Sequence, residues 1–534
     1  MFKRSSYQLF LLLLTLTVVL AACASEPDDD ASSNGDDAGT TSEGESGGDL
    51  IVATGSDAAS LDPHTSSDVP SGNIQINIYE TLVKFNEDME LEPLLAESWD
   101  AVEDNVWEFK LQEGVTFHDG SEFNAEVVKQ NIERILDEEL ASPRRVLFDL
   151  IDEVVVVDEF TVQVVTEFPF APLPAHFAHY ASSILSPDII EADFAAVEEG
   201  DQHGTYINEN PVGTGIFEFG DWEPGTQIIL NRNDDYWGDA AKVDTVTFKV
   251  VPEDLTRIAE LETGESHIID PVTPSDLAQV EERDGMEAYI RNAASISYLG
   301  FNMEKEPYDD LRVRQAIAMV IDKDLIIEGI LEDTGEKAVG PINDTNFGYS
   351  DQVEGIERDP EKAKELLAEA GYEDGFETTI WTNDSRERMD IATMTQEELA
   401  QIGIDAEINV VEWGAYLDST AAGEHDMFIL GLSLGTGDAD YPMHMLFHSE
   451  NVGSTGNRTF MVDETFDEML HEARIEQDED ARLQLYIDAT NYLNEQVPMA
   501  FLYHPAHIMG HREEVQGFWA DASGLYQLRD VTIQ

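Results

Sequence analysis

A glycine-rich turn around residue 438 carries the side chains with the clearest chemistry. It follows a short apolar run, residues 427–430, which predicts a buried strand. The turn brings Asp438, Asp440 and Tyr441 to the carboxyl end of that strand, and ligands of open α/β sheets bind outside such ends. A carboxylate beside an aromatic ring suits an ammonium group. The same residues also suit a solvated surface turn in an acidic protein, so the surrounding elements have to decide between the two readings.

Two further strands should end beside this turn. Residues 376–381 and the alternating residues 404–410 predict strands, and residues 389–402 predict the helix between them. A strand-helix-strand unit implies a parallel pair with a right-handed crossover. If the strand at 427–430 joins the same sheet, then Trp381, Trp413 and the Asp438 turn lie at one edge. Trp413 and Tyr441 could form an apolar wall with a polar handle there, or they could be core aromatics.

The composition limits the fold and the partners of the chain. Its 534 residues are too many for one core, so we expect two large lobes. The 29 basic residues against 111 acidic ones give a net charge of −82, which excludes nucleic-acid binding through phosphate neutralisation. The acidic residues are spread along the chain, which suits a solvated surface in a salty or alkaline exterior.

Histidines raise the possibility of a metal site. His444 and His448 are four residues apart and could meet on one helical face, and His504, His507 and His511 form a looser group. Neither group has a cysteine or carboxylate at a fixed spacing, so we predict packing and surface histidines, no metal and no cofactor. No nucleophile paired with a base and no His-Glu-x-x-His motif stands out, and we therefore expect no enzyme.

The amino terminus predicts export and anchoring. Lys3 and Arg4 precede an apolar run over 9–20, which is too short for a comfortable membrane span and is typical of a signal peptide. The run leads into Leu-Ala-Ala-Cys, which resembles the bacterial lipobox, so we expect removal of residues 1–22 and a lipid on Cys23. Residues 23–49, rich in Ser, Gly, Asp and Glu, predict a disordered tether. No other segment has membrane length.

Residues 94–134 carry a specific family resemblance. They contain Ala-Glu-Ser-Trp, Gly-Val-x-Phe-His-Asp-Gly and Phe-Asn-Ala-Glu-x-Val in this order, in a predicted meander that runs into a helix capped by Asn124. The chain resembles the family 5 extracytoplasmic solute-binding proteins, which serve peptide and nickel ABC importers. Further matches at 210–215, 233–238, 261–269 and 299–302 extend the resemblance over nearly the whole mature chain.

The resemblance implies a two-lobe α/β fold of the periplasmic-binding-protein type, with a cleft between the lobes. We expect a first lobe over 50–271, completed by residues 505–534, and a second lobe over 272–504. The resemblance also implies a monomeric lipoprotein outside the cell membrane that captures a dipeptide, an oligopeptide or a glutathione-like peptide and presents it to an ABC permease. A nickel, haem or oligosaccharide carrier on the same scaffold is the alternative. A secreted hydrolase and an adhesive lipoprotein are more distant rivals.

The same resemblance implies roles for single residues. The aspartate of Thr-Gly-Asp, here Asp438, holds the α-ammonium of the peptide in the dipeptide-binding relatives. An arginine in the loop after an earlier strand binds the peptide carboxylate in those relatives, and Arg386 is the candidate here, although its loop is shorter. The other residues expected at the ligand are Trp413, Tyr441, Thr436 and Asn302.

Replacement of Cys23 tests the anchor. Cys23→Ser removes the thiol that would carry the lipid, so the protein should be released into the medium or should accumulate as uncleaved precursor. Membrane fractionation and the mass of the amino terminus measure this outcome. Ser25→Ala is the matched control and should leave processing unchanged. Normal cleavage and membrane retention of the Cys23→Ser variant would contradict the assignment.

Overall fold

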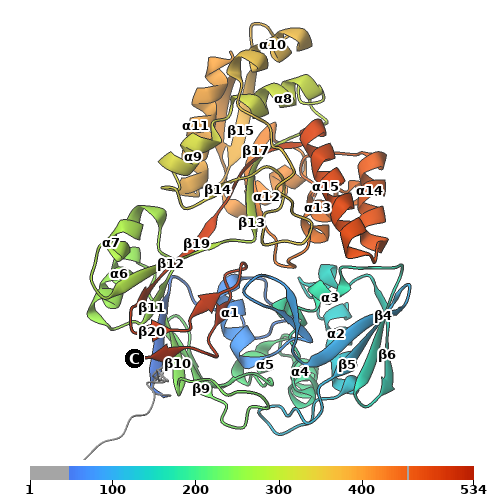
Figure 1. The fold of residues 1–534 in the computed structure, drawn as a ribbon, viewed down its shortest axis with the longest axis vertical. Helices are drawn as coiled ribbons and strands as arrows, with labels where there is room; N and C mark the ends of the chain where they lie inside the picture. Colours follow the sequence, from blue (N-terminus) through green and yellow to red (C-terminus); the bar gives the residue numbers. More distant parts are fainter. Residues whose placement is uncertain (1–46, 454–455) are drawn as a thin grey trace, which may run out of the picture. The chain divides into compact units, whose positions relative to one another are not determined.

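Seven strands form the first of two large sheets (Figure 1). The computed structural model describes residues 47–453 and 456–534. The strand order is β12-β19-β11-β1-β10-β9-β8, with β1 parallel to β10 and β11 and the other neighbours antiparallel. The strands are β1 (Asp49–Thr54), β8 (Phe217–Glu223), β9 (Gln227–Arg232), β10 (Thr245–Val250), β11 (Ile268–Asp270), β12 (Met286–Asn292) and β19 (Ala506–Arg512).

A separate four-stranded antiparallel sheet has the strand order β4-β5-β7-β6 and is formed by residues between β1 and β8 of the first large sheet. Helix α2 packs on β6 and β7, and Phe109, Phe123 and Val162 are buried in their common core. These elements are β4 (Ala96–Glu103), β5 (Val106–Leu111), β6 (Ile151–Asp158), β7 (Thr161–Thr166) and α2 (Ala125–Leu136). Smaller elements nearby in the chain are α1 (Val69–Ile78), β2 (Val83–Phe85), β3 (Leu91–Pro93), α3 (Leu173–His176), α4 (Pro187–Glu199), α5 (Thr205–Glu209), α6 (Asp254–Thr263) and α7 (Leu277–Glu281).

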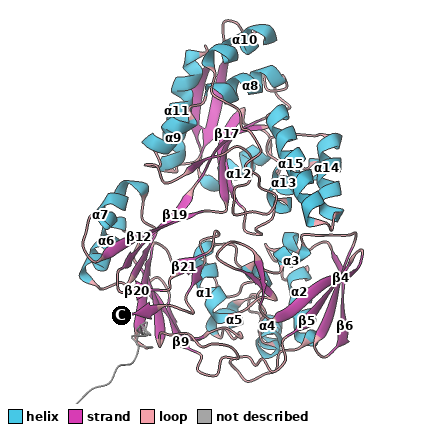
Figure 2. Cartoon of the chain, viewed as in Figure 1, coloured by secondary structure: helices cyan, strands magenta, loops and turns pink. Residues whose placement is uncertain are grey.

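The second large sheet has six strands in the order β14-β18-β13-β17-β15-β16. Its strands are β13 (Ser295–Phe301), β14 (Glu336–Lys337), β15 (Glu377–Thr382), β16 (Asp405–Val410), β17 (Met427–Ser433) and β18 (Met499–His504). Figure 2 shows helices around these strands. The helices of this part are α8 (Leu311–Val320), α9 (Lys323–Gly329), α10 (Pro360–Ala370), α11 (Arg386–Gln401), α12 (Trp413–Ala421), α13 (Asp440–Phe447), α14 (Glu464–Ile475) and α15 (Glu479–Gln496).

The predicted strand-helix-strand unit is confirmed. β15 and β16 are parallel and joined by α11, and β17 is parallel to β15 on its other side. Ile380, Ile391 and Leu399 are buried in the core between this sheet and α11, which is why their apolar spacing was readable in the sequence. Because the three strands are parallel, their carboxyl ends lie at one edge of the sheet, and the loop that contains Asp438 leaves from that edge.

Two short connections join the two large sheets. β12 continues into β13 through residues 293–294, and β18 continues into β19 through Pro505. The predicted border after residue 271 gave residues 286–292 to the second lobe, whereas β12 pairs with β19 in the first large sheet. That long-range pairing has no local signature in the sequence. We therefore propose the lobe borders at residues 293–294 and 505.

Local signals at the helix ends are confirmed. The side chain of Asn124 accepts hydrogen bonds from the backbone N–H groups of Glu126 and Val127, as an N-cap does. Asp359 caps α10 with Pro360 in the first turn, and Gly371, at φ +94°, ends the helix in the left-handed conformation.

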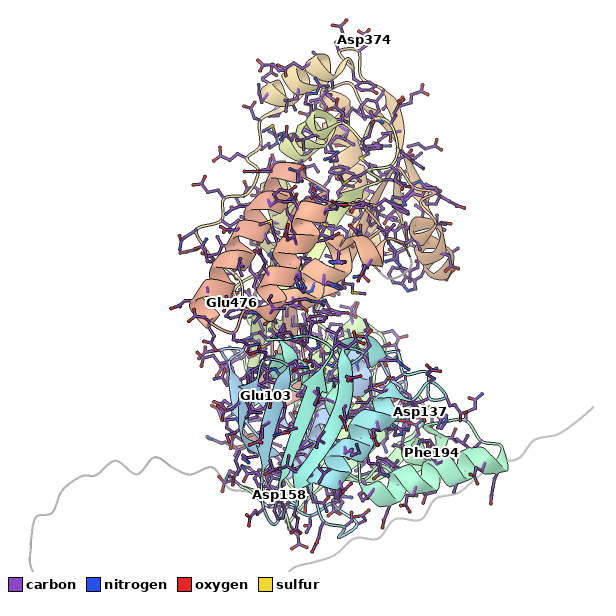
Figure 3. All side chains as sticks on the ribbon, turned by 90° about the vertical axis from the view of Figure 1, so that its right-hand side faces the viewer. Glu103, Asp137, Asp158, Phe194, Asp374 and Glu476 are labelled. Atoms are coloured by element: carbon purple, nitrogen blue, oxygen red, sulfur yellow. The ribbon has the colours of Figure 1, made fainter. Side chains whose placement is uncertain are left out.

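Acidic side chains project from several parts of the surface. Glu103, Asp158 and Asp374 are exposed and point away from the ribbon in Figure 3. No helix among the described residues is both long enough and apolar enough to cross a bilayer. The predicted signal peptide, Cys23 and nearly all of the predicted tether lie outside the described residues.

Candidate functional site

The loop from β17 to α13, residues 434–439, is fixed by backbone hydrogen bonds at both ends. Leu434 donates to the carbonyl of Ala294, and Phe347 exchanges two backbone bonds with the loop, to Gly437 and from Ala439, at 2.8 and 2.9 Å. Gly437 has φ +62°, and a Cβ at this position would lie 2.8 Å from the ring of Phe85. The glycine thus allows the loop to pass close to the β2–β3 hairpin.

Asp438 lies in this loop as half of a buried ion pair. Its side chain is almost inaccessible, and both carboxylate oxygens accept from Arg482 of α15, at 2.6 and 2.8 Å. The N–H of Asp440 also donates to Asp438 Oδ1. Arg482 lies close to the rings of Phe347 and Tyr486, which are nearly perpendicular to each other. Burial disfavours the charge of Arg482, but Asp438 and its neighbours together raise the pKa of this guanidinium. Asp438, which was predicted to bind the ammonium group of the ligand, is therefore already paired with a cation of the protein itself.

Asp440 has an equivalent partner in Arg474 of α14. The guanidinium donates to both carboxylate oxygens at 2.7 and 3.1 Å, and its charge keeps the pKa of Asp440 below the usual value although burial acts in the opposite direction. Arg474 also lies over the ring of Phe170, and its carbonyl accepts from the N–H of Ala171 at 2.9 Å. Asp440 thus secures a contact between the two parts of the fold.

One side of the loop faces a cavity of about 640 Å³, which we name the acidic cavity. Its wall contains six carboxylates and one guanidinium, that of Arg482, together with four aromatic rings. The carboxylates belong to Asp88, Glu90, Asp344, Asp438, Glu476 and Glu479, and the rings belong to Phe85, Trp99, Trp107 and Phe347. Excess negative charge beside aromatic faces suits a cationic group that carries an apolar portion.

A second cavity, of about 140 Å³, adjoins the same loop and is named the Arg144 cavity. It contains no acidic side chain, and Arg144 is its only arginine or lysine. Its lining residues are Ser67, Val69, Arg144, Leu147, His179, Tyr180, Leu432, Ser433, Gly435, Thr436, Tyr441, Ser523 and Leu525. The first part of the fold and the segment after β17 both contribute to this wall.

Three of the predicted site residues lie at these cavities. Asp438 lines the acidic cavity, and Thr436 and Tyr441 line the Arg144 cavity. Tyr441 also packs against the core around β4–β7, and burial raises the pKa of its phenol. The turn singled out in the sequence is therefore a cavity wall and not a solvated surface turn.

The other three predicted residues lie elsewhere among the described residues. The side chain of Arg386 is 93% exposed because this residue opens α11 and points outward from its first turn. Trp413 is 42% exposed and lies beneath the guanidinium of Arg388. Asn302 is buried, and its amide donates to the carbonyls of Gly423 and His425, which ties β13 to the segment before β17. None of the three lines either cavity.

The histidine pair has a carboxylate neighbour that the sequence analysis missed. Possible ligand atoms of His444, His448 and Glu450 lie within 4.8 Å of one another, and the two rings stack at 4.3 Å. Asn451 donates to Nδ1 of His444, and burial, reinforced by the charge of Arg474, lowers the pKa of His444 to about 3. These contacts account for the pair as packing side chains. The later histidines are separate, and each hydrogen-bonds a backbone carbonyl: His504, His507 and His511.

A serine motif of hydrolase spacing was also passed over. Residues 431–435 read Gly-Leu-Ser-Leu-Gly. In a nucleophile elbow the serine lies on a sharp turn from a strand into a helix. Here Ser433 is the last residue of β17 and pairs with Ser295, whereas α13 begins only at Asp440. No histidine of the described residues hydrogen-bonds its hydroxyl, so the elbow geometry is missing.

Arg144, Arg474 and Arg482 are the site residues that sequence reasoning did not find. They come from segments far from the Asp438 turn, and no motif marks them. The available signal was scarcity: with 29 basic residues against 111 acidic ones, each arginine is a candidate partner for a buried carboxylate.

The chain is similar to known bacterial binding proteins in sequence and in fold. The model of the bacterial extracellular solute-binding proteins, family 5, matches residues 90–454. The dipeptide-binding protein of Escherichia coli K12 is 31% identical over 86% of this chain and 89% of its own. The glutathione-binding protein GsiB of Pectobacterium atrosepticum is 30% identical over 91% and 94%. The solved structure of DppA from Helicobacter pylori with the peptide STSA is 32% identical, with a TM-score of 0.77 over 92% of this chain and 98% of that one. The two-lobe α/β fold is confirmed.

Removal of the charge on Asp438 should destabilise the protein. Asp438→Asn leaves Arg482 buried without its counter-charge, a change that costs about 3–5 kcal/mol of unfolding free energy. Urea unfolding of the ligand-free protein measures this loss. Asp234→Asn, in an exposed pair with Arg232, is the control and should hardly move the midpoint. An unchanged midpoint for Asp438→Asn would show that the pair contributes nothing to folding.

Proposed function

We propose that this chain, which belongs to the bacterial extracellular solute-binding proteins of family 5, captures short peptides outside the cytoplasmic membrane and delivers them to an ABC importer. The observation that carries the proposal is the contrast between the two cavities beside one loop. The acidic cavity has an excess of carboxylates, and the Arg144 cavity has a guanidinium and no carboxylate. A peptide with free termini carries the matching pair of charges.

Three of the relatives named above support a peptide ligand. The curated proteins similar to this chain are named as dipeptide- and glutathione-binding proteins, and the Helicobacter structure contains a bound tetrapeptide. The family consists of binding components of transporters, and the lack of elbow geometry at Ser433 is consistent with that role. These relatives support a role as the binding component of a transporter.

The ammonium end of the peptide belongs in the acidic cavity. Asp438 contributes to its wall beside Gly437, and five further carboxylates surround the space. Since Arg482 neutralises Asp438, the cation is attracted by the excess charge of the whole wall together with Asp438, and not by one free carboxylate. This differs from the single clamp that the family resemblance implied.

The protein works at the outer face of the membrane as a lipid-anchored monomer. Cys23 would carry the lipid, and the residues before β1 would act as the tether. Ligand capture would proceed by closure of two lobes about the connections at residues 293–294 and 505, because short paired strand connections are typical hinges.

Titration with a peptide series tests the function. Dipeptides to pentapeptides and glutathione should bind, and amino-acetylated versions should bind about 30-fold or more weakly, because they lack the charge that the acidic cavity attracts. Isothermal titration calorimetry measures both. Full affinity for acetylated peptides would contradict the assignment of the ammonium end. Mass spectrometry that finds haem or an oligosaccharide copurifying in place of peptide would overturn the peptide function.

The histidine pair provides a separate test against nickel transport. Replacement of His444 and His448 by Asn should leave peptide affinity within about twofold, because neither residue lines either cavity. Calorimetry with Ni²⁺ should give the same weak or absent signal before and after the change. Tight Ni²⁺ binding that disappears in the double variant would make metal carriage the better assignment.

A further inference from the structure

We infer that Arg144 binds a free carboxylate of the ligand, and that the Arg144 cavity is the subsite for the carboxyl end of the peptide. The inference rests on the proposed peptide function and names the residue that supplies its second charge contact. It replaces Arg386, whose side chain extends into solvent.

The charge of the Arg144 cavity distinguishes it from the rest of the molecule. The chain carries 111 acidic residues, yet none of the residues that line this cavity is acidic. The only histidine in the wall is His179, and burial followed by the charge of Arg144 lowers its pKa well below the usual value. Arg144 is therefore the only charged side chain among the lining residues at neutral pH, which favours an anionic group. The carboxylate of Asp68, which lies between the lining residues Ser67 and Val69 in the sequence, accepts hydrogen bonds from Ser71 at the start of α1.

Arg144 is oriented by neutral partners that leave part of its guanidinium unused. Its Nε donates to the carbonyl of Ser66 at 3.2 Å, and one terminal nitrogen donates to the hydroxyl of Tyr180. The guanidinium also lies over the Tyr180 ring, 5.0 Å from its centre. Its Nη1 has no hydrogen-bond acceptor within residues 47–453 and 456–534, and no carboxylate of these residues forms an ion pair with Arg144. Arg134, Arg474 and Arg482 differ, because each is paired with a carboxylate.

His179 adds a neutral donor to the same wall. Its Nδ1 accepts from the N–H of Ala181 at 3.0 Å, which places the proton of the neutral ring on Nε2. This Nε2 lies next to Gly435, where a Cβ would approach it to 3.2 Å. Hydroxyl groups of Ser67, Ser433, Thr436 and Ser523 complete the polar lining. A carboxylate in this cavity can thus accept charge-assisted and neutral hydrogen bonds together.

The position of the cavity fits the carboxyl end of a short peptide. Thr436 lines the Arg144 cavity, and Gly437 and Asp438 line the acidic cavity, so the two cavities lie on neighbouring residues of one loop. A short peptide that runs along this loop from the acidic cavity would bring its carboxylate to Arg144. The volume of about 140 Å³ accommodates a terminal carboxylate with a small side chain and not a folded chain.

Calorimetry with free and carboxy-amidated peptides tests the inference. Arg144→Gln should weaken binding of peptides with a free carboxylate about 30-fold or more, because a buried charge contact is lost. Amidated peptides should bind the wild type weakly and should lose little more in the variant, since the contact is missing in both cases. Arg145→Gln, the neighbouring arginine whose Nη1 donates to the carbonyl of Leu136, and Arg386→Gln are controls and should retain wild-type affinity.

The outcomes separate this inference from the proposed function. Wild-type protein that binds no peptide of any length overturns the function, and the inference with it. If wild-type protein binds peptides and Arg144→Gln binds them equally well, or if the loss occurs in Arg386→Gln, the function stands and the inference is wrong. An equal loss for free and amidated peptides in Arg144→Gln, with an unchanged thermal midpoint, also overturns it, because the effect then does not depend on the carboxylate.

Discussion

Two buried ion pairs hold the loop on which both cavities depend. Asp438 and Asp440 are nearly inaccessible to solvent, and a carboxylate in such a position costs several kcal/mol to desolvate unless a cation and hydrogen bonds compensate. Arg482 and Arg474 supply that compensation from positions 44 and 34 residues further along the chain. Helices α14 and α15 pack against each other and so fix the spacing of the two arginines. The cavities beside the loop therefore require a helix pair that is distant in sequence.

The scarcity of basic residues makes each buried arginine informative. Arg134 neutralises Asp62 within the first part of the fold, and Arg314 donates to the backbone carbonyls of Tyr308 and Gln496 in the second. In both cases the guanidinium satisfies internal oxygen atoms, so its role is structural. Arg144 donates to a carbonyl and a phenol and lines a cavity without acidic side chains. A cavity wall that contains an arginine and no acidic residue contrasts with the net charge of −82 of the whole chain.

Local signals in the sequence predicted the fold well where one segment determines the outcome. The apolar spacing around Ile380 and Leu399 and the cap at Asn124 are set by neighbouring residues, and the structure has them as predicted. Long-range pairing was not readable in this way. The membership of β12 in the first large sheet depends on β19, which lies more than two hundred residues later.

The candidate site was predictable only in part, for the same reason. The turn at Asp438 follows from a strand and a glycine, and Thr436 and Tyr441 accompany it to a cavity wall. The partners of that turn come from distant helices, so the sequence predicts Asp438 as the residue that binds the ammonium group without indicating that Arg482 already pairs with it. Arg386 opens α11 and its side chain extends into solvent, so it lines neither cavity, and its role at the ligand stays a prediction. A sequence motif was thus enough to identify the loop. The arginine partners of its carboxylates can be identified only in the tertiary structure.

The proposed binding of a peptide by both cavities would couple ligand binding to the relative position of the lobes. Arg144 precedes β6 in the first part of the fold, whereas Asp438 and Arg482 belong to the loop and helix of the second. A peptide that contacts Arg144 with its carboxylate and the acidic cavity with its ammonium touches both lobes, and it makes both contacts only when they are close together. Both lobes contribute to the wall of each cavity, so separation of the lobes weakens both charge contacts, and a ligand stabilises a conformation only by its difference in affinity between states. A peptide blocked at either end retains one contact that spans the lobes and therefore loses part of the energy that favours closure.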